Sequence, residues 1–299
     1  MSGNKYLCDL LDCQRLDETS SEWEELSDKA ARIESIIRAA YPDSNLTFTY
    51  GGSRAKGTMI RDDYDLDLVA YFENDDTAPG ETLEDIYEAN AKLLGKHYTI
   101  RRKRSAVRLS KKAGSDLRVD FVSGRYVDET TTDVFIHQNE SNKERLKTNI
   151  EVHIAHVRDS GCTDVIMLSK FWKGRMGIDI KTFPLELLVI AILVANDGGN
   201  LEQRFMRVLT AFAERIDEIE IEDPANPTGN DLSHALPDKL RKQLAKIAAD
   251  TLVTVEEHGW EHIFGRIETR EATLPRIQIL RSAAASVSVP TKPWGGARE

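Results

Sequence analysis

The order of hydrophobic and polar residues gives the first part of the chain a mixed character. Two segments have apolar residues at helical spacing, one following Ser21 and one near 81–95. Ser21 and Glu24 have the spacing of a capping box at the start of the first helix. Segments in which apolar and polar residues alternate predict strands at 46–50, 65–72, 97–101, 105–109, 117–123 and 133–137. We therefore expect an α+β lobe over residues 1–141.

From residue 142 the pattern becomes almost wholly helical. Helices are predicted at 142–159, 163–175, 184–196, 199–216, 237–257 and, more weakly, 274–285. The last residues, 286–299, contain two prolines and paired glycines, a composition typical of a flexible tail. The expected organisation is an α+β lobe at 1–141, a helical lobe at 142–285 and this tail. An active site would then lie in the cleft between the two lobes.

Composition places the chain among ordinary globular proteins. Its 299 residues are 40% hydrophobic and 30% charged. The longest apolar run, from Leu187 to Ala195, is too short to span a bilayer, and the first residues lack the apolar core of a signal peptide. The three cysteines have no metal-ligand spacing and fit a reducing compartment. We therefore expect a cytoplasmic protein with no membrane partner.

The net charge narrows the choice of partners. A formal charge of −10 argues against strong, non-specific binding to nucleic acid. One basic cluster, Arg101 to Arg104, stands out against this acidic background. It could bind nucleotide phosphates, or it could be a solvated hairpin between two strands, and the sequence favours neither reading.

The most informative segment is a glycine-rich turn that precedes an acidic strand. Adjacent glycines let the backbone approach a phosphate closely, and the hydroxyl of Ser53, which follows Gly52, can bond at a helix N-terminus. Farther on, Asp65 and Asp67 are two residues apart in a predicted strand, so both carboxylates leave the same face. Two carboxylates beside a phosphate cradle suit a hard divalent cation such as Mg²⁺ and a nucleoside triphosphate.

A two-metal phosphoryl-transfer site needs a third carboxylate. Asp120 is the best candidate, because it is the one acid in a hydrophobic strand at 117–123. Glycine-serine turns and Asp-x-Asp pairs also occur in ordinary solvated turns, so each piece alone says little. All three pieces in this order resemble the nucleotidyltransferase superfamily with the polymerase-β-like palm. That resemblance implies a mixed sheet with Asp65, Asp67 and Asp120 as catalytic and metal-binding residues.

Two later segments extend the resemblance into the helical half. Lys170 and Lys173 lie three apart on one predicted helical face and could simply be surface lysines. The segment is similar to a helix of oligoadenylate synthetases and cyclic-nucleotide synthases, in which a lysine before an aromatic residue binds the triphosphate. Lys170 matches that position, and Lys173 is a weaker match. Phe183 matches an aromatic residue that stacks on a base in these families, although it could equally be a core residue.

A proline-stiffened loop gives the last match. Residues 223–230 resemble the Asp-Pro-x-x-Pro-x-x-Asn loop of oligoadenylate synthetases, for which we expect a largely structural role. Glu186, at the start of an apolar helix, is expected to be a buried, paired carboxylate rather than a catalyst. Pro184 stands where these families usually have a small residue, a change that a first helical turn tolerates.

Together the motifs resemble the bacterial cyclic-oligonucleotide synthases of anti-phage signalling systems, the CD-NTases of CBASS, which are related to oligoadenylate synthetases. The resemblance implies a template-independent nucleotidyltransferase that uses NTPs, ATP among them, with Mg²⁺ or Mn²⁺. Gly52, Ser53, Lys170, Lys173 and Phe183 would bind the nucleotide. Regulatory or effector proteins of the same defence system would be its partners. Two alternatives stay open: a tRNA or protein nucleotidyltransferase of the same fold, and a non-catalytic nucleotide-binding module.

Overall fold

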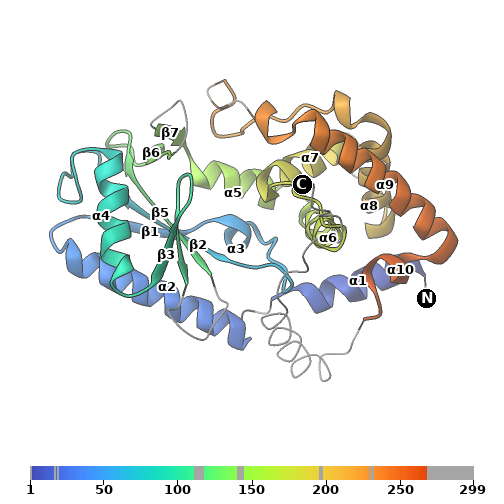
Figure 1. The fold of residues 1–299 in the computed structure, drawn as a ribbon, viewed down its shortest axis with the longest axis horizontal. Helices are drawn as coiled ribbons and strands as arrows, with labels where there is room; N and C mark the ends of the chain where they lie inside the picture. Colours follow the sequence, from blue (N-terminus) through green and yellow to red (C-terminus); the bar gives the residue numbers. More distant parts are fainter. Residues whose placement is uncertain are drawn as a thin grey trace, which may run out of the picture. The chain divides into compact units, whose positions relative to one another are not determined.

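The computed structural model describes residues 2–267, with the exception of 17, 19, 111–117, 140–144, 195–197, 229 and 231. Residues up to Phe264 form one compact unit (Figure 1). Its helices are α1 (Gly3–Gln14), α2 (Ser21–Ala40), α3 (Gly52–Lys56), α4 (Leu83–Gly95), α5 (Ile150–Arg158), α6 (Thr163–Arg175), α7 (Thr182–Val194), α8 (Leu201–Arg215), α9 (Asp238–His258) and α10 (Trp260–Phe264). Its strands are β1 (Thr47–Tyr50), β2 (Leu66–Phe72), β3 (Thr99–Arg102), β4 (Val107–Ser110), β5 (Val119–Tyr126), β6 (Val134–His137) and β7 (Arg145–Thr148).

The strands form one mixed sheet. Their order is β1-β2-β5-β4-β3, with β6 pairing to β5 and β7 pairing to β6. Only β2 and β5 are parallel among the paired strands described, and their register sets Asp67 opposite Asp120. Since the chain must cross over to return to a parallel strand, α4, β3 and β4 all lie between these two strands in the sequence.

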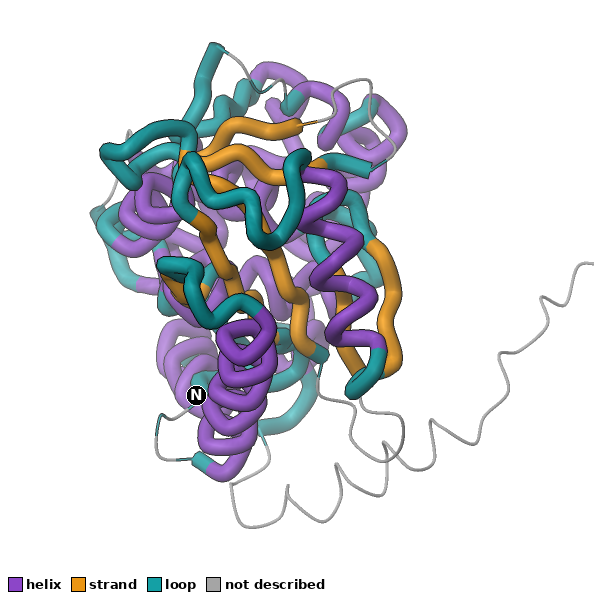
Figure 2. The backbone as a smooth tube through the Cα atoms, turned by 90° about the vertical axis from the view of Figure 1, so that its left-hand side faces the viewer, coloured by secondary structure: helices purple, strands orange, loops and turns teal. Residues whose placement is uncertain are grey.

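Each face of the sheet is covered. On one face, α2 and α4 pack through Leu26, Ile33 and Ile86 against strand residues such as Leu68 and Phe121. Helix α4 touches β3, β4, β5 and β6, and Figure 2 views the sheet from the side on which α4 lies. On the other face is a smaller cluster of buried residues from β2, β5 and β6, with Ile150 of α5 against it. The two acids, Asp67 and Asp120, belong to this second face.

The helical half is built around two helices that are buried almost all round. Along α6 and α7 nearly every residue from Val165 to Trp172 and from Pro184 to Ile190 is buried. Helix α7 contacts α5, α6 and α8, and α8 packs against α9. Helix α1 packs against α6, α8 and α10, so the N-terminal helix lies with the helical half. Within the described ranges, no helix is both long and apolar enough to cross a membrane.

The structure corrects several sequence predictions. The helix predicted at 142–159 is β7 followed by α5; residues 145–148 pair with β6, and the side chain of Asn149 caps α5. Helices α1 and α10 were not predicted. The N-cap of α2 is Ser20, whose hydroxyl accepts from the backbone N–H of Trp23, so the expected capping box at Ser21 is wrong. The predicted helix at 274–285 and the tail at 286–299 lie outside the described residues, and the boundary at 141/142 stays a prediction.

Candidate active site

Three acids meet where β2 and β5 run side by side. Asp65 directly precedes β2, Asp67 lies within it, and Asp120 lies opposite Asp67 on β5. Since side chains two residues apart leave the same face of a strand, and paired residues share a face, the three carboxylates converge. Asp120 is the most enclosed, with 4% of its surface exposed. The structure therefore brings together the three acids that the sequence singled out.

Burial and the charges of neighbouring carboxylates together set the electrostatics of this cluster. Burial, followed by the charges of Asp65 and Asp120, raises the pKa of Asp67 to about 7. Burial and the charge of Asp120 also raise the pKa of Asp65. Burial acts in the same direction on Asp120, but hydrogen bonds from Arg108 and Lys103 outweigh it, and the pKa of Asp120 is lowered. An added positive charge at this point would be strongly favoured.

Two basic side chains from the β3–β4 hairpin form ion pairs with the acids. Arg108 faces Asp120 across the β4–β5 pair and donates from Nε to Oδ1 and from a terminal nitrogen to Oδ2, both at 2.7 Å. The same terminal nitrogen is 2.6 Å from Oδ2 of Asp65. Lys103 donates to Oδ2 of Asp120 at 2.5 Å. The basic cluster is thus the end of β3 and the hairpin turn, from which Lys103 reaches the site.

Sequence reasoning missed Arg108. The alternation of Val107, Arg108 and Leu109 places the arginine on the face opposite two core residues, and this signal was present in the sequence. What the sequence does not give is the register that sets Arg108 against Asp120. A charged residue in the middle of a short strand is the general sign of such a partner.

The acids suit a hard divalent cation in their chemistry, since carboxylate oxygens are the ligands that Mg²⁺ and Mn²⁺ prefer. Among the described side chains, no group of three or more His, Cys, Asp or Glu is arranged to hold a metal ion as it stands. The contacts explain this, because oxygens of Asp65 and Asp120 are occupied by Arg108 and Lys103. Burial and neighbouring carboxylates raise the pKa values of Asp65 and Asp67, and a bound cation would oppose both effects by favouring the ionised carboxylates.

The glycine loop lies directly on Asp67. The backbone N–H of Gly51 donates to the carbonyl oxygen of Asp67, which joins the loop to β2. Gly52 has a φ of 56°, and a Cβ atom there would lie 1.6 Å from Oδ2 of Asp67. Only glycine allows this approach, so the loop runs against Asp67 at Gly52, the residue before Ser53. Helix α3 ends at Lys56, with Gly57 as its C-cap, and the N–H of Thr58 donates to the carbonyl oxygen of Ser53.

Lys170 lies beneath this loop rather than on the surface. It is 3% exposed, and its Nζ donates to the carbonyl oxygen of Thr58 at 2.6 Å. Burial lowers the pKa of Lys170 to about 8, against the opposing effect of Glu186. Lys173 is less enclosed and donates to the carbonyl oxygen of Ile180 and to the hydroxyl of Thr182. The surface-lysine alternative is therefore wrong for Lys170, while nucleotide binding by either residue stays a prediction.

A buried ion pair fixes the other end of the loop. Nζ of Lys56 is 2.7 Å from Oε2 of Glu186 on α7, and the hydroxyl of Thr58 donates to Oε1 of the same carboxylate at 3.3 Å. The expectation that Glu186 is buried and paired is confirmed. Two contacts from the helical half, Lys170 to Thr58 and Glu186 to Lys56, thus hold α3 in place.

Phe183 is partly buried at the start of α7, next to this ion pair. The ammonium of Lys56 lies 4.7 Å from the centre of its ring, and the ring of His153 is 4.7 Å away on a tilted plane. The aromatic ring is therefore close to the glycine loop. These contacts allow both earlier readings, a core residue and a residue that stacks on a base.

The proline-stiffened loop is held by one buried carboxylate. Asp223 pairs with His153 at 2.6 Å and accepts from the side-chain amide of Asn230 at 2.7 Å and from the N–H of Ala225 at 2.9 Å. Despite burial, the hydrogen bonds from His153 and Asn230 lower the pKa of Asp223 to about 2. These bonds give the loop the structural role expected of it, and they connect it through His153 to Phe183.

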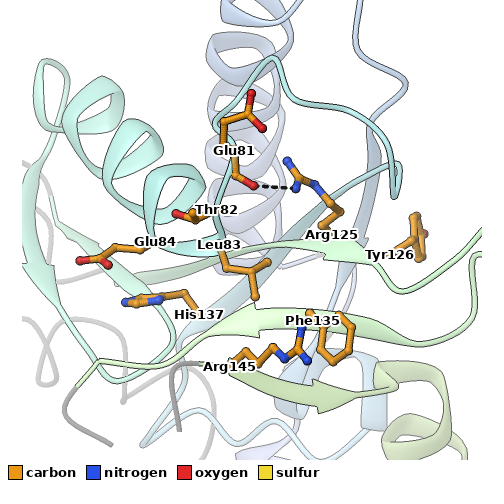
Figure 3. Close-up of a pocket in the computed structure, with 9 residues that line it drawn as sticks. All are labelled: Glu81, Thr82, Leu83, Glu84, Arg125, Tyr126, Phe135, His137 and Arg145. Atoms are coloured by element: carbon orange, nitrogen blue, oxygen red, sulfur yellow. Dashed lines mark hydrogen bonds between the residues drawn. The ribbon is translucent and has the colours of Figure 1, made fainter.

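A separate pocket of about 410 Å³ lies on the opposite face of the sheet (Figure 3). Phe135 and His137 alternate on β6 with the residues that pack on the acid side, so they point away from it. Arg125, drawn in Figure 3 with its bond to the carbonyl oxygen of Glu81, also donates to the carbonyls of Asp76 and Gly80. It fixes the loop before α4 rather than offering its charge to a ligand. This pocket is therefore distinct from the acid cluster.

Comparisons with known proteins agree with the fold. No family model matches the chain. In sequence it is similar to the CBASS oligonucleotide cyclase CdnC of Escherichia coli (strain KTE188), with 26% identity over 258 residues that cover 72% of this chain and 80% of the relative. In structure it is similar to CdnC of E. coli MS115-1, solved with ATP, at a TM-score of 0.67 and 19% identity, covering 88% of this chain and 98% of that one. For the same CdnC, solved in a CdnC:HORMA-deltaN complex, the TM-score is 0.67 and the identity 18%. The match covers 88% of this chain and 97% of that one.

Proposed function

We propose that this chain, which belongs to the CD-NTase family of nucleotidyltransferases, joins nucleoside triphosphates at Asp65, Asp67 and Asp120 and releases pyrophosphate. Its product is a cyclic oligonucleotide second messenger of anti-phage defence. The observation that carries the assignment of the site is the register of β2 and β5. That register sets Asp67 and Asp120 side by side on one face of the sheet. Asp65 is two residues before Asp67, and the glycine loop contacts Asp67 through Gly52.

The three carboxylates hold the reacting groups together. A divalent cation bound there, Mg²⁺ or Mn²⁺, would polarise the donor's α-phosphate and lower the pKa of the acceptor's ribose hydroxyl. Asp120 assists removal of the proton from that hydroxyl, directly or through the cation it would hold, and the hydroxyl oxygen forms a bond to the α-phosphorus. The bond from this phosphorus to the β-phosphate oxygen breaks, and pyrophosphate leaves. Repetition of the step on the linear intermediate, with its own free hydroxyl as the acceptor, closes the ring.

The glycine loop and the helical half bind the donor nucleotide. Gly52 lets the backbone approach the phosphates, and Ser53 offers its hydroxyl to them. Lys170 supports the loop from beneath through Thr58 and supplies positive charge close to the β- and γ-phosphates. Phe183 stacks on a base, and Lys173 holds the start of α7 through Thr182 and Ile180.

The solved relatives suggest the substrates and partners. CdnC of E. coli MS115-1 was solved with ATP and in a complex with a HORMA protein. We therefore propose ATP as one substrate and an accessory protein of the same defence system as a regulator. The formal charge of −10 agrees with small anionic substrates delivered with a cation rather than with a long nucleic acid.

Product analysis tests this function. The purified protein is incubated with MgCl₂ or MnCl₂ and each labelled NTP, alone and mixed, and the products are treated with phosphatase and resolved by mass. A phosphatase-resistant oligonucleotide is expected from the wild type and from Asp43→Asn, an exposed acid in the turn after α2. None is expected from Asp67→Asn. If label appears on tRNA or on a co-expressed protein and no resistant product forms, the chain is a different transferase of the same fold. Without any transfer, it is a binding module.

A further inference from the structure

Arg108 is placed to neutralise the acid cluster from within. One terminal nitrogen of its guanidinium lies between two carboxylates, 2.6 Å from Asp65 and 2.7 Å from Asp120, while Nε makes a second bond to Asp120. Its side chain is 19% exposed, so the contacts are shielded from water and salt. A forked guanidinium can bridge two carboxylates in this way, whereas an ammonium acts as a single point charge.

The charges nearly balance without any added ion. When all three are ionised, as they are at a pH well above the raised pKa of Asp67, the carboxylates carry three negative charges, and Arg108 and Lys103 return two positive charges. Lys103 is the weaker of the two, because its side chain is 39% exposed and it reaches only Asp120. Arg108 therefore occupies both oxygens of Asp120 and one oxygen of Asp65, where it competes with a divalent cation.

We propose that Arg108 is a positioning residue that acts as an internal counter-cation: it holds Asp65 and Asp120 together before a divalent cation arrives and competes with that cation for their oxygens. The inference rests on the proposed function, because it takes the three carboxylates as the cation site. Its consequence is that the protein binds a divalent cation weakly when no nucleotide is present. Such an ion must displace a guanidinium that is bonded to both carboxylates, and it enters a site with one net negative charge instead of two.

Binding of Mn²⁺ to the nucleotide-free protein tests this inference, with free Mn²⁺ measured by electron paramagnetic resonance. Arg108→Gln removes the charge and keeps a polar side chain, and it should bind Mn²⁺ at least tenfold more tightly than the wild type. Arg102→Gln is the matched control, because Arg102 belongs to the same hairpin but pairs with exposed Glu88. Its affinity for Mn²⁺ should equal that of the wild type. Arg108→Lys keeps the charge without the forked guanidinium, and its affinity for Mn²⁺ should lie between that of the wild type and that of Arg108→Gln.

Adding Asp67→Asn to Arg108→Gln localises the effect and should abolish the gain in Mn²⁺ affinity. Circular dichroism and thermal melting identify any variant that fails to fold, in which case Arg108→Lys carries the test. An unchanged Mn²⁺ affinity in folded Arg108→Gln and Arg108→Lys would overturn the inference. If the wild type still binds Mn²⁺ with ATP in a manner that depends on Asp67, the proposed function survives that result. Absence of Asp67-dependent Mn²⁺ binding in every variant, with or without ATP, would overturn the metal site itself.

Discussion

Lys56 and Glu186 are 130 positions apart in the sequence, and the ammonium of one lies 2.7 Å from the carboxylate of the other in the interior of the protein. Lys56 is the last residue of α3, and Glu186 lies in the second turn of α7. Because the side chains are only 9% and 1% exposed, neither charge can turn to water if its partner is lost. The pair therefore ties the glycine loop to the helical half.

Replacement of Glu186 by Gln should be costly. The change leaves the Lys56 ammonium buried without a counter-charge, which typically costs roughly 3–5 kcal/mol of unfolding free energy. The measurement is urea unfolding of the nucleotide-free protein. Glu88→Gln is the control, because its pair with Arg102 is about half exposed on both sides, and a change of at most about 1 kcal/mol is expected. Equal effects of the two changes would mean that Lys56 finds water or another partner.

Asp67→Asn should abolish catalysis and stabilise the metal-free protein at neutral pH. The pKa of Asp67 is about 7 in the folded state and 3.8 as a reference. Between these values the folded state holds a proton that the unfolded state has lost, so the unfolding free energy falls as the pH rises from 3.8 to 7. Asn cannot ionise and so removes this loss. The unfolding free energy of the variant should therefore exceed that of the wild type by roughly 1–3 kcal/mol at pH 8.

Urea unfolding at pH 4 and pH 8 checks the sign of this prediction. At pH 4 most Asp67 side chains are protonated in the folded state, so the variant and the wild type should have similar unfolding free energies. If the gain in unfolding free energy from Asp67→Asn is equal at the two pH values, ionisation of the buried Asp67 carboxyl is not its cause. Asp43→Asn should leave both values unchanged, since Asp43 is exposed.

Lys170→Ala should weaken nucleotide binding more than Lys173→Ala. A charge-assisted hydrogen bond contributes roughly 1.5–3 kcal/mol, which corresponds to about ten- to hundredfold in affinity. Lys170 also supports the carbonyl of Thr58, so its loss disturbs the loop, whereas the described hydrogen bonds of Lys173 are to Ile180, just before α7, and to Thr182 at its start. Titration of each variant with a fluorescent ATP analogue and Mg²⁺ gives the two dissociation constants. Equal, small effects would remove both lysines from the nucleotide site.

Arg54 should fix the glycine loop against α2 and β1. Its guanidinium lies 4.2 Å from the ring centre of Trp23 and 3.8 Å from that of Tyr50, and it donates to the hydroxyl of Ser27. Arg54→Met keeps the aliphatic bulk and removes cation–π contacts worth roughly 0.5–2 kcal/mol. Because Arg54 follows Ser53, we expect KM for ATP to rise about three- to thirtyfold while kcat changes little.

A second cation–π contact supplies the control for Arg54. Arg38 of α2 lies 4.8 Å from the ring centre of Phe48 and pairs with Glu34, with no contact to the loop. Arg38→Met should lower the melting temperature by a similar amount and leave KM for ATP unchanged. A parallel rise of KM in both variants would make Arg54 a general contributor to stability instead of a positioning residue.

The sequence was sufficient for the parts of the site that depend on local pattern. Period-two alternation placed Asp65 and Asp67 on one face, and the strand around Asp120 had a single acid, so these three could be identified before any fold was known. The β-strands before residue 141 were also found, with no end shifted by more than three residues. Such boundaries depend on pairing partners, which a local pattern does not contain.

What could not be predicted depends on which distant segments meet. Nothing local to Arg108 indicates that β4 pairs with β5 in the register that sets it against Asp120. The pairing of Lys56 with Glu186 likewise follows from the packing of α3 on the helical half. Strand β7 was read as part of a helix because four residues are too few for a periodicity, and its pairing with β6 decides its conformation.

The parallel pairing of β2 with β5 also has a consequence for how the molecule acquires its activity. Two parallel strands cannot form a hairpin, and here α4, β3 and β4 separate them along the chain, so closing this pair costs considerable chain entropy. Contacts of such long sequence separation tend to form late in folding. We therefore expect nascent or partly folded chains to contain no assembled acid cluster and to consume no nucleotide. Synthesis of the messenger would begin only once the pairing of β2 with β5 is complete.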